Sequence, residues 1–175
     1  MISETSGSGF SVLDGVGLVA GAAVASVHLR GVLDESLWGP GWVILLGTFG
    51  WVGLTAAGPF LYLLRRFARG LPAYPKIGDR LWALLGLPWL VTALIQTASP
   101  PQVPATPLDV FPASLLLIGL GIESMIALGV VWTTWVMVDP EQASATFAGP
   151  WTNQVGLLLA ITWPIQFGVG LVVIG

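Results

Sequence analysis

Four stretches of the sequence are as long as a membrane span and contain almost no charge. They cover residues 41–64, 81–98, 110–138 and 151–175, and Glu123 is the single charged residue within them. About 20 apolar residues in a helix cross the hydrocarbon layer of a bilayer. Because a backbone in lipid must satisfy its own hydrogen bonds, these stretches are expected to be helices.

A fifth apolar stretch, residues 10–33, is interrupted by Asp14, His28 and Arg30. We still expect it to span, because polar groups near its ends can reach the interface. Charged residues make up 9% of the chain, against roughly 25% in soluble domains. The sequence therefore predicts an all-α membrane protein: one domain over residues 1–175, a bundle of about five transmembrane helices, and no soluble domain.

The basic residues predict the orientation of this bundle. Five of the six lie between the second and third spans: Arg65, Arg66, Arg69, Lys76 and Arg80. The positive-inside rule puts that connection, and hence the N-terminus, in the cytoplasm and the C-terminus on the opposite side. We expect a bacterial-type inner membrane. A basic cluster also attracts anionic lipid headgroups, and the candidate contacts are Arg65, Arg66, Arg69 and Lys76.

The residue inventory excludes several chemistries. The chain has no cysteine and one histidine, which leaves no disulfide, iron–sulfur cluster, bis-histidine haem or multi-histidine metal site. The only lysine, Lys76, lies in the basic connection, so a retinal Schiff base within the membrane is excluded. No phosphate loop and no basic-aromatic stripe is present, and we expect no nucleic-acid partner.

Glu123 is the most informative single residue, because it falls near the centre of the fourth span. An ionised carboxylate there costs on the order of 3 kcal/mol or more, so the neutral acid is the expected resting form. Two readings stay open: a protonated carboxyl that holds helices together, or a proton or cation carrier. Thr92 and Gln166 fall at similar depth and are candidate partners for a ligand or ion.

Small residues predict where helices pack closely. Gly17 and Gly21 form a GxxxG pair, which lets two helix backbones approach each other within the chain or across a subunit contact. Gly119 and Ala127 lie one turn before and after Glu123. We therefore expect Glu123 to face protein on a small-residue surface.

Histidine and tryptophan supply the remaining candidate sites. His28 lies at the predicted outer boundary and is either an interfacial anchor, a single axial ligand to a metallated tetrapyrrole, or a proton acceptor. Trp89 and Trp163 fall near the middle of the membrane, each beside a proline. They either pack within the bundle or line a site for a flat apolar ligand.

From these features we expect a non-catalytic, multi-pass membrane subunit of a larger complex. Its expected partners are membrane lipids and other membrane subunits, and it could hold lipid or an apolar cofactor, although no motif encodes one. The alternative is a small oligomeric transporter or channel that uses Glu123 as its proton or cation site. A lipid-modifying membrane enzyme is the third class, in which Asp139 and Glu141 form the only close carboxylate pair of a predicted cytoplasmic loop.

Overall fold

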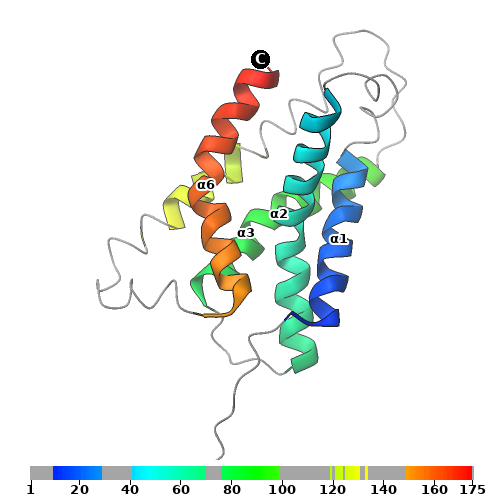
Figure 1. Ribbon diagram of the computed structural model, residues 1–175, viewed down its shortest axis with the longest axis vertical. Coiled ribbons are helices and arrows are strands. Elements are labelled where there is room, and N and C mark those ends of the chain that lie inside the picture. Colours follow the sequence, from blue (N-terminus) through cyan, green and yellow to red (C-terminus); the bar gives the residue numbers. More distant parts are fainter. Residues whose placement is uncertain are drawn as a thin grey trace, which may run out of the picture.

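The fold is known from a computed structural model that describes residues 10–28, 41–69, 76–98, 119, 121–123, 125–130, 133 and 149–174. Four helices are defined along this part of the chain: α1 (Val12–His28), α2 (Gly41–Arg69), α3 (Ile77–Ala98) and α6 (Trp151–Ile174). A shorter apolar helix covers Gly121–Val130. The regular structure in these segments is helical throughout (Figure 1), which confirms the all-helical prediction.

One helix in the described part, α3, is long and apolar enough to cross a membrane by length and composition. Its 22 residues have a mean hydropathy of 1.6 over the most apolar window. Helix α1 is apolar but shorter, with 17 residues. The five membrane crossings therefore stay a prediction.

The helix limits differ from the predicted spans where charged residues defined those spans. Helix α2 continues through the basic residues to Arg69, five residues past the predicted end. Helix α3 begins at Ile77, with Asp79 in its first turn, where a negative charge favours the helix dipole. Charges mark where an apolar run stops, whereas a helix ends where its backbone hydrogen bonds stop. Most of the predicted span at 110–138 lies outside the described residues.

Helices α1 and α2 run in opposite directions, and so do α2 and α3, whereas α3 and α6 both begin at the same end of the bundle. Helix α1 packs against α2, α2 against α3, and α3 against α6. One end of the bundle, at the bottom of Figure 1, holds the beginnings of α1 and α6 and the end of α2. The start of α3 lies at the same end, because the Gly78 amide donates to Asn153 Oδ1 of α6 over 2.9 Å. We call this the basic end of the bundle, since Arg66, Lys76 and Arg80 lie there exposed.

The GxxxG pair of α1 is used inside the chain. A Cβ atom added to Gly21 would collide with the backbone oxygen of Gly53 and lie 2.7 Å from the Ala57 amide, both in α2. One added to Gly17 would lie 2.7 Å from Leu61 Cδ2. Of the two alternatives left open by the sequence, the structure thus gives these glycines to α1–α2 packing.

Replacing Gly21 by leucine should therefore disrupt the fold. Overpacking a close contact costs about 1–3 kcal/mol even where side chains can shift, and at Gly21 the obstacle is the backbone of α2. We expect Gly21→Leu to abolish the monodisperse protein in size-exclusion chromatography. Gly47→Leu is the matched control, because a Cβ at the exposed Gly47 meets nothing within 4 Å. Equal behaviour of the two variants would contradict the packing argument.

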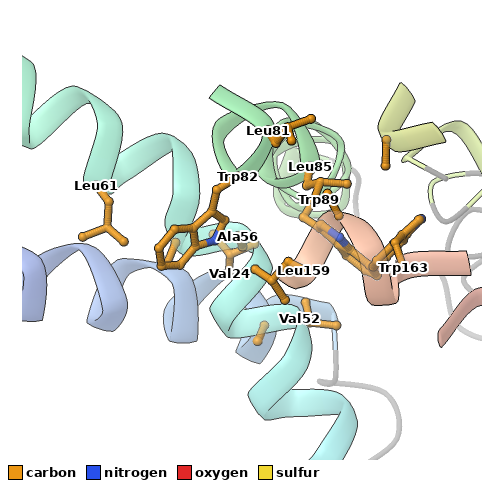
Figure 2. Packing of buried hydrophobic residues seen from close by; sticks show 14 of the residues in the cluster. Val24, Val52, Ala56, Leu61, Leu81, Trp82, Leu85, Trp89, Leu159 and Trp163 are labelled. Carbon is orange, nitrogen blue, oxygen red and sulfur yellow. The ribbon is translucent and has the colours of Figure 1, made fainter. Parts of the chain in front are cut away.

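The apolar core lies where α1, α2, α3 and α6 meet (Figure 2). Trp82 and Trp163 are its largest fully buried side chains. The Trp82 indole donates to the backbone oxygen of Leu54 in α2 over 2.8 Å, so its polar atom is satisfied. Ala127 is also fully buried, whereas a Cβ at Gly119 would meet nothing within 4 Å. A packing role for Gly119 stays a prediction.

Candidate functional site

Two buried polar clusters lie inside the bundle, and the first is at the basic end. Asp14 is fully buried in the first turn of α1. Its Oδ2 accepts the Ser11 amide over 2.9 Å, and its own amide approaches Ser11 Oγ at 3.4 Å. This reciprocal arrangement is a capping box that satisfies donors at the start of the helix.

Arg65 of α2 connects three helices, because it contacts Asp14 of α1 and Thr152 of α6. Its Nε donates to Asp14 Oδ1 over 2.7 Å and its Nη2 to Oδ2 over 2.9 Å, which is a two-point ion pair between α1 and α2. Its Nη1 donates to Thr152 Oγ1 of α6 over 2.8 Å. The guanidinium carbon lies 5.4 Å from the centre of the Trp151 ring, within range of a cation–π contact. All four contacts are with protein.

Arg65 was predicted to contact lipid headgroups, and the structure gives its guanidinium these protein partners instead. The side chain is 12% exposed. Arg66 and Lys76 are exposed at the same end, and their headgroup contacts stay predictions. The side chain of Arg69 lies outside the described residues. The signal for the ion pair was present in the sequence, because Asp14 and Arg65 were expected at the same end of adjacent antiparallel spans.

The second polar cluster surrounds a small cavity toward the opposite end of α1 and α3. The cavity has a volume of about 10 Å³, which is room for about one water molecule. His28 of α1 and Glu123 provide the titratable groups of its lining. The remaining lining residues are Pro88, Trp89, Thr92, Gln96 and Gly119.

Glu123 is fully buried at this cavity, and neither of its carboxyl oxygens has a hydrogen-bond partner. Buried polar groups in proteins are nearly always paired, so an unpaired carboxyl requires an explanation. The Trp89 indole N–H is likewise buried and unpaired. It lies near enough to the carboxyl group to interact with it, although it does not form a hydrogen bond of standard geometry.

His28 reaches the cavity from the last turn of α1, with both ring nitrogens in contact with oxygen atoms. Nδ1 lies 3.0 Å from the Val24 carbonyl oxygen, which can only accept, so Nδ1 carries a proton. Nε2 lies 2.8 Å from Thr92 Oγ1. An axial-ligand role for His28 would require one of these contacts to break.

A chain of aromatic rings extends from His28 into the core. His28 packs edge-on against Trp89 at 5.2 Å, and Trp89 packs edge-on against Trp51 at 5.7 Å. Trp51 stacks on Trp163 at 4.4 Å. Figure 2 shows Trp89 and Trp163 extending toward one another from α3 and α6. These ring contacts support packing within the bundle.

The structure brings together three of the five residues predicted to bind a ligand or ion. Glu123, Thr92 and Trp89 line one cavity, and Trp163 lies two ring contacts away. Gln166 is not part of the lining; its Nε2 contacts Thr162 Oγ1 at 3.4 Å, and its Oε1 is buried without a partner. Gln96 was not predicted, yet it follows Thr92 by one helical turn and was therefore accessible to the same reasoning.

Within the described residues no group of three or more histidine, cysteine, aspartate or glutamate side chains is placed to hold a metal ion. No protein-family model, curated protein or solved structure matches this chain. A functional assignment therefore depends on the geometry of the two polar clusters and of the outer surface.

Proposed function

We propose that this chain is a multi-pass membrane protein with an internal proton site at Glu123. The membrane assignment is supported by the outer surface of the described helices. Exposed apolar side chains recur at helical spacing on α1, α3 and α6: Val12, Val16 and Val19; Leu84, Leu87, Val91 and Leu94; Leu158, Ile161 and Ile165. Several are more than half exposed, for instance Leu94 at 68% and Ile165 at 69%.

The surface of the bundle is more apolar than that of a soluble protein, although its core is apolar too. Many valine, leucine and isoleucine side chains face outward, while the polar side chains of Asp14, Thr55, Glu123, Thr152 and Asn153 are buried. In the described part of the chain, the exposed charged residues lie at the basic end alone. An apolar surface this extensive is stable against lipid and prone to association in water.

The positive-inside rule, applied to the basic end, supports an inner membrane of bacterial type with the N-terminus in the cytoplasm. The chain has no cysteine, so single introduced cysteines report topology without background. We expect a membrane-impermeant maleimide to label Gln102→Cys in intact cells, and Arg66→Cys only after permeabilisation. Equal labelling of both positions in intact cells would contradict this topology, and the cysteine-free chain is the control.

The function that the site supports best is proton carriage by a small transporter. The observation that carries it is Glu123, which is fully buried, unpaired and part of a cavity shared with His28. An intramembrane carboxyl group of this kind is typical of proton pathways. Between the two polar clusters the buried side chains include Val52, Ala56, Leu81 and Leu85, and the buried Thr55 hydroxyl donates to the Trp51 carbonyl oxygen of its own helix. This mostly apolar core favours a carrier over an open pore.

Proton flux in vesicles reconstituted with the purified protein, compared with that of Glu123→Gln, tests this function. The site fits a proton better than a metal cation, since the Trp89 indole N–H is a donor near the carboxyl group. At about 10 Å³, the cavity also has no room for a tetrapyrrole or a quinone. We propose no catalytic activity for the chain.

A second candidate function, as a non-catalytic subunit of a larger membrane complex, is favoured by a different observation. An outward-facing groove of about 200 Å³ runs between α1 and α2. Its lining is apolar and includes small residues that let another helix or a lipid tail approach: Leu18, Ala22, Phe49, Gly50, Gly53 and Leu54. Absence of proton flux from a well-folded protein would favour this candidate over the first.

A further inference from the structure

We propose that His28 is the proton-exchange partner of Glu123, and that the Thr92 hydroxyl relays the proton between them. This inference rests on the proposed proton site and adds the groups that load and unload it. Its basis is geometric: His28 and Glu123 line the same cavity, and Thr92 Oγ1 lies 2.8 Å from His28 Nε2.

The Thr92 hydroxyl has one proton and three neighbouring acceptors. Besides His28 Nε2, its oxygen lies 2.9 Å from the Pro88 carbonyl oxygen and 3.1 Å from that of Trp89. When His28 is neutral, with its proton on Nδ1, the hydroxyl donates to Nε2. When Nε2 is protonated, it donates to Thr92 Oγ1, and the hydroxyl must turn to a backbone carbonyl. The hydroxyl orientation thus follows the charge of His28.

The transfer balances without any reagent other than water. The O–H bond of neutral Glu123 breaks and its proton passes to a water molecule, for which the cavity has room. The water passes a proton to Thr92 Oγ1, and the original Thr92 proton moves to His28 Nε2. The products are a Glu123 carboxylate and a His28 imidazolium, while water and the Thr92 hydroxyl are regenerated.

Trp89 is positioned to stabilise both products. Its unpaired indole N–H lies near the Glu123 carboxyl group, and a carboxylate accepts a stronger hydrogen bond than a neutral acid does. Its ring centre lies 5.2 Å from that of His28, within the range of a cation–π contact once the imidazole is charged. Within the described part of the chain, the other cavity-lining side chains are not titratable.

The single histidine of the chain makes the test specific. Protein labelled with nitrogen-15 in histidine gives one imidazole, whose charge is read by NMR as a function of pH. Removing a nearby counter-charge disfavours the imidazolium, and a change of one pH unit in the titration is a tenfold change in its population. In the wild-type chain proton transfer from Glu123 maintains some imidazolium even above the pH at which His28 would otherwise be neutral. Glu123→Gln removes this source, so we expect it to lower the imidazolium population at such a pH by about tenfold or more.

Thr92→Val removes the hydroxyl at nearly constant volume, and we expect it to reduce proton flux by about tenfold or more, the typical size of a lost proton-transfer group. Thr92→Ser should restore the flux. Thr97→Val is the matched control, because the exposed Thr97 hydroxyl donates to the Leu94 carbonyl of its own helix. Circular dichroism of Thr92→Val and Thr97→Val establishes whether these two variants fold.

The outcomes separate this inference from the proposed function. If Glu123→Gln abolishes flux but leaves the His28 titration unchanged, the proton site stands and the exchange pair is wrong. If the titration shifts without any flux, the pair stands and transport is wrong. A change of the His28 signal on adding sodium at fixed pH would assign the cavity to a cation and overturn the exchange pair.

Discussion

Replacing Glu123 by glutamine should reduce proton flux through reconstituted vesicles to that of vesicles without protein. Glutamine has nearly the shape of a protonated glutamate but cannot release a proton at any accessible pH. The carboxyl group is fully buried at a cavity with room for about one water molecule. We therefore expect the variant to block the proton at a single point without rearranging the helices around it.

The stability of this variant separates chemistry from folding. Since the neutral acid and the amide are similar in size, the free energy of unfolding should change by less than about 1 kcal/mol. Asp79→Asn is the control, because it removes a carboxylate from the first turn of α3 at the basic end of the bundle, away from the cavity. It should keep the wild-type flux. A folded Glu123→Gln protein with unchanged flux would rule out the proton site.

Much of this architecture follows from the charge-free runs. A backbone in an apolar environment must satisfy its own hydrogen bonds, so each long charge-free run predicts a helix. The predicted spans at 41–64 and 81–98 fall within α2 and α3, and α6 covers the predicted span at 151–175 up to Ile174. The same runs cannot give helix ends, as α2 shows by continuing through Arg65 and Arg66 to Arg69. Arginine is a good helix former, so a basic cluster at the end of a span extends the helix.

The sequence predicted several residues of the candidate site, but it did not predict how they are arranged in space. Depth along a span brings Thr92 and Glu123 to similar levels, and the structure gives them one cavity. Depth alone could not exclude Gln166, because two residues at one level can face different neighbours around the helix. Nor could it predict that His28, expected at a boundary, contacts Thr92. The rotation of each helix depends on packing at Gly21 and similar contacts, which sequence periodicity does not resolve.

Breaking the Asp14–Arg65 ion pair should produce a large loss of stability. Both partners are largely removed from solvent, and each is hydrogen-bonded at two points to the other. Removing one partner of a buried pair leaves an uncompensated charge and costs about 3–5 kcal/mol. We expect that loss for Asp14→Asn and for Arg65→Gln, measured by denaturant unfolding of the detergent-solubilised protein.

The double variant distinguishes a true pair from two separate contributions. Asp14→Asn with Arg65→Gln leaves no unpaired charge, so its loss should be smaller than the sum of the single losses by about 0.5–3 kcal/mol. Arg66→Gln is the matched control, because Arg66 is exposed on the next position of α2. It should change stability by no more than about 0.5 kcal/mol. Additive losses in the double variant would contradict direct coupling.

The same variants test whether the two polar clusters act independently. Asp14 and His28 lie on the same helix, 14 residues apart in the sequence, which is about 21 Å at 1.5 Å per residue. The ion pair joins α1, α2 and α6 at the basic end, whereas the cavity joins α1, α3 and the helix of Glu123. We therefore expect Asp14→Asn to weaken the fold while the surviving folded protein retains its proton flux, because stability and proton exchange depend on opposite ends of α1.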